Sequence, residues 1–291
     1  MKSGMAQPVR PARAALGPAA RWARAALSAG SALSLAAMAP VSARADDLSV
    51  LLEPRTLVSV GGLLGSGPRF PGAGKSGVWA FPYLSLRGPD EPRDWWSPDD
   101  GLDFSFVRQG PLEVGAVLDL REARSARDDR RLMGLPRLPL APAAGLFAEV
   151  WPVEGVLRLR AEVTQGLRER DGVVAKIGAD VVAHLGRFTL SGGPRLVVGD
   201  TAAERLAFDV PVRSALLNPL LAPYRAAAGP RSIGATGAVS YDWSESWQVL
   251  AYLRYDRMIG SAGASPIVRR TGRLDEVTVG TGLIHTFAVG Q

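Results

Sequence analysis

The residues from 247 to 255 alternate between apolar and polar side chains with a period of two. The odd-numbered positions form an apolar face bracketed by aromatic side chains: Trp247, Val249, Ala251, Leu253 and Tyr255. The even-numbered positions form a largely polar face that begins at Gln248 and ends at Arg254. Successive side chains of a strand point to opposite faces, and a lipid-facing strand needs about 9–11 residues with aromatic side chains at the two water interfaces. This stretch therefore predicts a strand of a membrane β-barrel.

The same alternation recurs along the chain between clusters of Gly, Pro, Asp and Arg. The predicted strands are 56–64, 77–87, 101–109, 112–121, 142–151, 155–168, 172–185, 187–199, 231–243, 246–258 and 273–287. Short links at 110–111, 152–154, 186 and 244–245 are interleaved with longer ones at 88–100, 122–141, 200–230 and 259–272. Short turns at one end and long loops at the other are typical of bacterial outer-membrane barrels.

The number of predicted strands is odd, whereas single-chain bacterial barrels have an even number. We therefore expect 10 to 12 strands, with one assignment in error. A further strand at 48–52 or 203–210 would restore an even number, and so would a 56–64 run that fails to span.

A water-soluble barrel or sandwich would show the same alternation with its apolar face turned inward. In 231–243 the less apolar face carries only small side chains, Ser232, Gly234, Thr236, Ala238 and Ser240. A solvated face would usually carry Lys and Glu, whereas small residues suit a crowded barrel interior. The prediction is an all-β fold, an antiparallel transmembrane β-barrel that forms one domain over residues 46–291.

The first 45 residues are typical of an export signal. Basic residues are followed by an apolar stretch from Ala25 to about Val41, and small residues precede a cleavage site between Ala45 and Asp46. This segment holds six of the 34 Lys and Arg residues and none of the 28 Asp and Glu residues. The remainder is balanced in charge, so the net charge of +6 gives no reason to expect nucleic acid. After residue 45 no apolar run is long enough for a helical membrane span.

Charged residues recur on the face predicted to line the barrel interior. They are Glu113, Asp119, Arg121, Arg158, Arg160, Glu162, Lys176, Asp180, Arg195, Arg254, Asp256 and Glu276. Buried charges must be paired, and a barrel of this size lies between side-chain-filled and open barrels. We expect an ion-pair network in an occluded interior, or a narrow, weakly selective pore.

Enzymatic chemistry finds little support in the chain. The absence of cysteine excludes disulfides, thiol catalysis and Cys-ligated metals. Of the two histidines, His184 falls on the interior face and His285 on the lipid-side register near Phe287. No G-x-S-x-G elbow is present. We predict no catalytic residue, no metal site and no cofactor.

Two other patterns each have a structural and a functional interpretation. The loop 122–141 and its flank carry a dense run of charge that includes Arg121, Arg124, Arg127, Arg130 and Arg131. They indicate a solvated loop, or a surface that binds lipopolysaccharide phosphates through bidentate contacts. Trp95 and Trp96 indicate an anchor at the membrane interface, or a platform for carbohydrate stacking.

Several segments resemble the MipA/OmpV family of outer-membrane proteins, also called MltA-interacting proteins. Residues 65–72 read Gly-Ser-Gly-Pro-Arg-Phe-Pro-Gly, 81–84 read Phe-Pro-Tyr-Leu, and 132–135 read Leu-Met-Gly-Leu after the strand 112–121. The C-terminal third carries Pro-Tyr-Arg-Ala-Ala-Ala-Gly at 223–229, Tyr-Asp-Arg-Met-Ile-Gly-Ser-Ala at 255–262 and Ser-Pro-Ile-Val at 265–268. The chain departs from the family at Ser261, where Asp is common, and in continuing past Phe287.

The resemblance implies a barrel in the outer membrane, in contact with its lipid and lipopolysaccharide. It also implies a scaffold that joins a lytic transglycosylase to a murein synthase. Two alternatives remain open: a narrow channel for small solutes lined by Arg158, Arg160 and Arg254, and a surface adhesin or receptor that uses loops 122–141 and 200–230.

Overall fold

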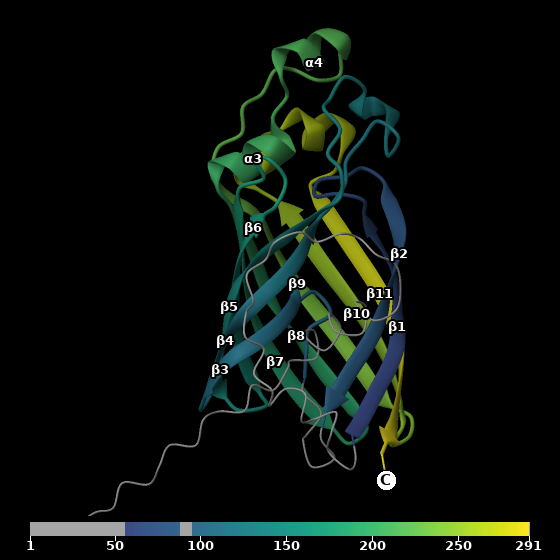
Figure 1. The fold of residues 1–291 in the computed structure, drawn as a ribbon. Coiled ribbons are helices and arrows are strands. Elements are labelled where there is room, and N and C mark those ends of the chain that lie inside the picture. The colour runs from purple at the N-terminus through teal and green to yellow at the C-terminus, as the bar shows by residue number, and fades with distance from the viewer. Residues whose placement is uncertain (1–55, 88–94, 291) are drawn as a thin grey trace, which may run out of the picture.

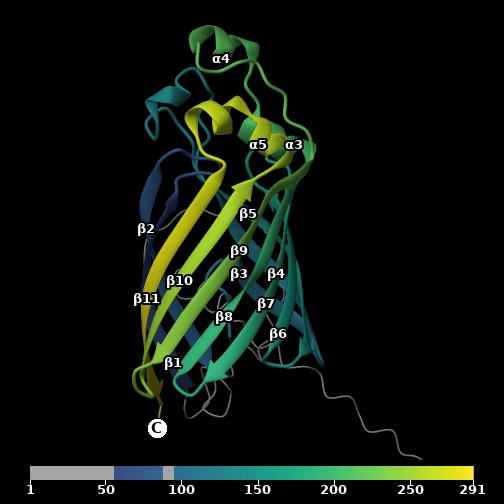
Figure 2. The ribbon, with the colours of Figure 1, turned by 180° about the vertical axis from the view of Figure 1, so that it is seen from behind.

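The computed structural model describes residues 56–87 and 95–290, and eleven antiparallel strands form one curved sheet (Figures 1 and 2). The strands are β1 (Thr56–Pro68), β2 (Ser76–Arg87), β3 (Leu102–Gln109), β4 (Leu112–Arg121), β5 (Ala141–Val153), β6 (Leu157–Gly166), β7 (Val173–Leu185), β8 (Phe188–Gly199), β9 (Gly229–Asp242), β10 (Trp247–Met258) and β11 (Asp275–Val289). Each corresponds to one of the predicted runs. The predicted all-β antiparallel barrel is therefore confirmed.

The order of the strands explains their odd number. The sheet runs β2-β1-β11-β10-β9-β8-β7-β6-β5-β4-β3, so the first and last strands of the sequence pair with each other within the sheet, next to its edge strand β2. Because every pairing is antiparallel, the two edge strands β2 and β3 run in the same direction. Two such strands cannot be joined by a hairpin. The connection includes residues 95–101, here called the re-entrant segment, which lie inside the barrel.

The strands suggested to restore an even number have different outcomes. Residues 203–210 lie mostly in the helix α3 (Thr201–Phe208), so this suggestion was wrong. The run 56–64 spans as part of the 13-residue strand β1. Residues 48–52 and the predicted cleavage site between Ala45 and Asp46 lie outside the described residues.

The outer surface of the sheet is apolar. Ile233, Leu253 and Val277 lie on three adjacent strands and expose 47%, 52% and 50% of their surface. The side chains that alternate with the exposed ones along these strands point inward, where Leu250 and Ile284 pack into a buried cluster with Tyr252. Large exposed side chains on successive strands are expected where lipid takes the place of water.

The long connections gather at the end of the barrel opposite the C-terminus (Figure 1). They contain α3, α4 (Val212–Leu217), α5 (Gly260–Ala264), a 3₁₀ turn η1 (Arg130–Leu132) and a π turn η2 (Ile267–Thr271). We call residues 122–140, 200–228 and 259–274 the cap. No helix within the described part of the chain is long and apolar enough to cross a membrane.

The cap is a packed layer rather than a set of solvated loops. Phe208, Met258 and Val268 form one of its buried clusters, and the hydroxyl of Tyr224 donates to the Ser261 carbonyl at 2.7 Å. The N-terminus of α3 is capped by Asp200, whose carboxylate accepts from the backbone N–H of Ala203 at 2.7 Å. The segments that resemble the MipA/OmpV family at 223–229 and 255–268 therefore meet in this layer.

A matched pair of substitutions tests the orientation of β10, since the natural chain has no cysteine. Leu253 is 52% exposed and Leu250 is 7% exposed. In protein folded into lipid vesicles, a lipid-soluble maleimide should modify Leu253→Cys readily and Leu250→Cys only after boiling. Folding is checked by faster electrophoretic migration of unboiled protein. Equal labelling of the two folded variants would contradict the assigned orientation.

Candidate functional site

The re-entrant segment brings two adjacent carboxylates into the barrel. Its residues Ser97 to Asp100 form a tight turn, in which the Asp100 N–H donates to the Ser97 carbonyl at 3.1 Å. The Asp100 carboxylate accepts from the Ser97 N–H at 3.1 Å, which fixes that side chain. Gly101 then donates its N–H to Glu162 of β6 at 3.3 Å. These contacts hold Asp99 and Asp100 in place beside the barrel wall.

Three arginines from three different strands converge on these carboxylates. Arg195 of β8 and Arg254 of β10 contact Asp99 at 2.8 and 3.0 Å. Arg158 of β6 contacts Asp100 at 2.7 Å. The separations in sequence are 96, 155 and 58 residues. The re-entrant segment is therefore tied by charged contacts to three strands of the wall, β6, β8 and β10.

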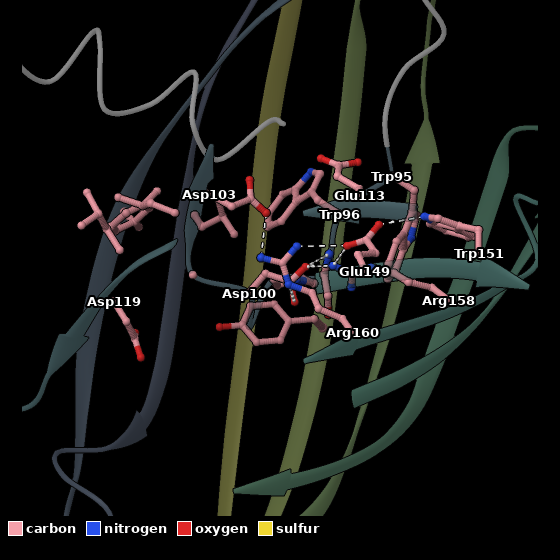
Figure 3. Close-up of a pocket in the computed structure, with 18 of the residues that line it drawn as sticks. Trp95, Trp96, Asp100, Asp103, Glu113, Asp119, Glu149, Trp151, Arg158 and Arg160 are labelled. Carbon is pink, nitrogen blue, oxygen red and sulfur yellow. Dashed lines mark hydrogen bonds and ion pairs between the residues drawn. The ribbon is translucent and has the colours of Figure 1, made fainter. Parts of the chain in front are cut away.

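The arginines are also paired with acidic residues of the wall. Arg158 contacts Glu149 at 2.7 Å and Asp180 at 3.2 Å. Arg160 contacts Asp103, Glu149 and Glu162 at 2.8, 3.0 and 2.8 Å. Figure 3 shows Arg158 and Arg160 pointing toward Glu149, with Asp100 beside them. Arg158 and Asp180 are each only 2% exposed, so these ions have exchanged water for one another.

The other residues predicted to line the interior belong to smaller groups. Lys176 contacts Asp119 at 2.7 Å, and Arg121 lies 3.7 Å from the same carboxylate. Arg254 contacts Asp256 at 2.5 Å. Two further acidic side chains have other partners: Glu113 contacts Arg108 at 3.1 Å, and Glu276 accepts from the Gly72 N–H at 2.6 Å.

The two histidines lie on opposite faces of the sheet. His184 is within 3.1 Å of the Thr189 hydroxyl and lines the interior cavity. His285 is 4.3 Å from the ring of Trp247 and 5.7 Å from that of Phe287, centroid to centroid. Among the described residues no group of three or more His, Cys, Asp or Glu could hold a metal ion.

The two tryptophans of the re-entrant segment do not anchor the barrel in lipid, which corrects that interpretation of their sequence. Trp96 stacks on Tyr83 at 5.5 Å between centroids. Trp95 meets Trp151 edge to face at 6.0 Å, and the guanidinium of Arg158 lies 5.0 Å from its ring centroid. Both indoles therefore help to fasten the re-entrant segment inside the barrel.

Sequence reasoning missed the chemistry of this segment and of the strand that follows it. Asp99, Asp100 and Asp103 were absent from the predicted interior charges although they bind its arginines. One signal was available, because the connection 88–100 is long for the end of the barrel that otherwise carries short turns. Together with the odd number of strands, it indicates a chain that re-enters the barrel.

A cavity of about 1300 Å³ lies beside the re-entrant segment and along the edge strands β2 and β3. It is lined by the aromatic side chains Trp79, Phe81, Trp95, Trp96, Trp151 and Tyr252 and by the charged network that includes Arg158 and Arg160. Within the network itself, the space lined by Asp99, Arg158, Arg195 and Arg254 is only about 20 Å³. That is enough for about one water molecule. The ion pairs therefore form a densely packed layer at the end of the cavity, which we interpret as closed.

Removing the charge of Arg158 tests how much this layer contributes to the stability of the barrel. Replacement of Arg158 by Met should lower the free energy of unfolding by about 3–5 kcal/mol, because Asp100 loses its close partner and Glu149 and Asp180 each lose one of two. The matched control is Arg257→Met, which breaks an exposed pair with Asp275 at 2.6 Å and should cause little change. Both are measured by urea titration of the folded barrel in lipid. Equal losses in the two variants would show that the interior pairs carry no special stability.

Comparison with known proteins places the chain in a family. The family described as MltA-interacting protein MipA matches residues 60–287. No curated protein matches the chain.

The similar solved structures are outer-membrane proteins. An outer-membrane channel from Pseudomonas putida F1 shares 11% identity over 86% of this chain and 100% of its own, with a TM-score of 0.42. OmpT of Vibrio cholerae shares 10% identity over 81% of this chain and 98% of its own, with a TM-score of 0.34. The NanC porin shares 10% over 79% and 98%, with a TM-score of 0.36. With a family match over most of its length, the chain belongs to the MipA family and is a β-barrel protein of the outer membrane.

Proposed function

We propose that this protein is a non-enzymatic scaffold of the outer membrane that holds a murein-degrading lytic transglycosylase and a murein synthase together. The observation that carries the proposal is the closed layer of ion pairs across the interior. The name of the family, MltA-interacting protein, supplies the class of partner. The murein synthase is the second partner that the family resemblance implies.

The closed layer argues against transport as the main role. A solute would have to separate Asp99 from Arg195 and Arg254, and Asp100 from Arg158, which lie at 2.7–3.0 Å. Each separation would leave charges that are largely shielded from water without a partner. We therefore place the function on the outer surfaces of the barrel.

The surface best suited to murein enzymes is the end that carries the short turns. In outer-membrane barrels this end faces the periplasm. The turn between β9 and β10, residues 243–246, projects there and carries Trp243, which is 68% exposed. Exposed aromatic side chains are common anchors of protein interfaces. We place the partner contact on this turn and its neighbours.

The first prediction from this proposal concerns conductance. The wild-type protein reconstituted into planar lipid bilayers should be electrically silent, because the ion-pair layer closes its interior. The cavity of about 1300 Å³ favours the competing role of a narrow channel. That role predicts discrete current steps that shift in size when Arg158 or Arg254 is neutralised. Such steps in the wild type would overturn the closed interior and favour the channel.

The second prediction concerns partner capture. Purified lytic transglycosylase should be retained by the folded, immobilised barrel. Trp243→Ala should weaken retention about tenfold, since it removes the exposed aromatic side chain of the proposed contact. The control replaces Leu216 and Leu217 of α4 by Ser, at the opposite end, where they are 82% and 71% exposed. Failure of the wild type to retain the enzyme would refute the scaffold, and a loss in the control alone would place the contact on the cap.

A further inference from the structure

A small chamber rich in arginine lies where the cap meets the barrel. It is bounded by the end of β4, the following loop, α3 and the connection between β6 and β7, and its volume is about 40 Å³. Its charged lining consists of Arg121, Arg124, Arg168, Arg231, Glu122 and Asp171. We call it the arginine chamber. It is separate from the ion-pair layer, with which it shares no lining residue.

Two of the four arginines are matched by carboxylates nearby. Arg168 donates from two nitrogens to Asp171 at 3.1 and 3.0 Å, and from its third to the Pro139 carbonyl at 2.7 Å. Arg231 donates to Glu204 of α3 at 2.8 Å. The bidentate contact of Arg168 uses the full geometry of its guanidinium. These two side chains need no further partner.

Arg121 is only partly matched. It is 7% exposed and donates to the carbonyl and hydroxyl oxygens of Thr164 at 3.0 and 2.9 Å. Its nearest carboxylate, Asp119, is 3.7 Å away and contacts Lys176 more closely, at 2.7 Å. The Nε–H of Arg121 is buried and has no hydrogen-bond partner in the described part of the chain.

Arg124 has no matching carboxylate among the described residues. It is 4% exposed and donates from Nη1 to the carbonyl of Ala207, in the last turn of α3. Its Nε–H is buried without a partner within residues 56–87 and 95–290. Burial, together with repulsion from Arg168, lowers the pKa of Arg124 to about 10. The side chain therefore remains charged at neutral pH.

A buried guanidinium that lacks a close counter-charge is costly. Arg124 has no carboxylate partner among the described residues, Arg121 has only the more distant Asp119, and each has a buried Nε–H without a partner. The carboxylate of Asp171 is bound to Arg168, and Glu122 is exposed. An anion in the chamber would supply the missing charge and accept from both groups. The chamber has room for more than the roughly 10–15 Å³ that one water needs, but not for a polymer.

We propose that the arginine chamber binds the phosphate group of a compact phosphate-class anion. Guanidinium groups match the oxygens of phosphate in geometry as well as in charge. The phosphate can come from two sources, free phosphate or the head group of lipopolysaccharide, since the cap lies at the outer end of the barrel. The exposed arginines of the same loop, such as Arg127, do not line the chamber. The proposal is independent of the scaffold function.

The test uses the full folded protein in detergent micelles and isothermal titration with inorganic phosphate at constant ionic strength. One phosphate should bind per chain, and chloride should not displace it. Arg124→Met should weaken binding about tenfold or more, the value of one hydrogen bond to a charged group. The matched control Arg127→Met removes the same charge from an exposed position of the same loop and should bind as the wild type does.

A second readout guards against variants that simply unfold. Phosphate should raise the temperature at which unboiled wild-type protein loses its fast electrophoretic migration, and it should not raise that of Arg124→Met. Arg121→Met serves as the second variant and should behave in the same way. Lipopolysaccharide that binds in an Arg124-dependent manner, with no heat from inorganic phosphate, would identify the head group as the source. Absence of both, or equal losses in Arg124→Met and Arg127→Met, would overturn the proposal.

Discussion

The pairing of charges that have been removed from water is the constraint on which the rest of the structure depends. Arg158, Arg195 and Arg254 come from three strands of the wall, where Asp180 and Asp256 already pair with them. The re-entrant segment supplies Asp99 and Asp100 at 2.7–3.0 Å from these guanidiniums. Because the pairing fixes where this segment lies, it also fixes the direction in which β3 begins. The odd number of strands and the closed interior follow from the same contacts.

The two faces of each strand meet this constraint differently. The outer face is largely apolar, for example at Ile233 and Val277, and its ion pair of Arg257 with Asp275 is exposed. The inner face is divided along the barrel into an aromatic-lined cavity, the ion-pair layer and the arginine chamber. In the arginine chamber, Arg124 has no carboxylate partner among the described residues, and Arg121 has only Asp119 at 3.7 Å. The arginine chamber thus differs from the other two regions of the interior, because part of its counter-charge is missing within the described chain.

Much of the fold was predictable because alternation is a local property of a strand. Each predicted run became a strand, and the interior positions of Arg158 or Asp180 followed from counting by two. The helix α3 was missed, although Asp200 before Thr201 is a recognisable N-cap. The partners of Asp99 could not be predicted, since they lie 96 and 155 residues away and no local pattern reports them. The packing of the cap could not be predicted for the same reason, because its buried clusters join residues of three separate loops.

The pairing of β1 with β11 has a kinetic consequence. Strands β3 to β11 are joined as successive neighbours, so their contacts are local and can form one hairpin after another. The β1–β2 hairpin instead docks onto the last strand, and Ser59 meets Thr286 across 227 residues of sequence. Contacts of such separation are slow to form. The protein is therefore expected to assemble from two units of unequal size. The small β1–β2 hairpin docks only after the larger unit, strands β3 to β11, has formed.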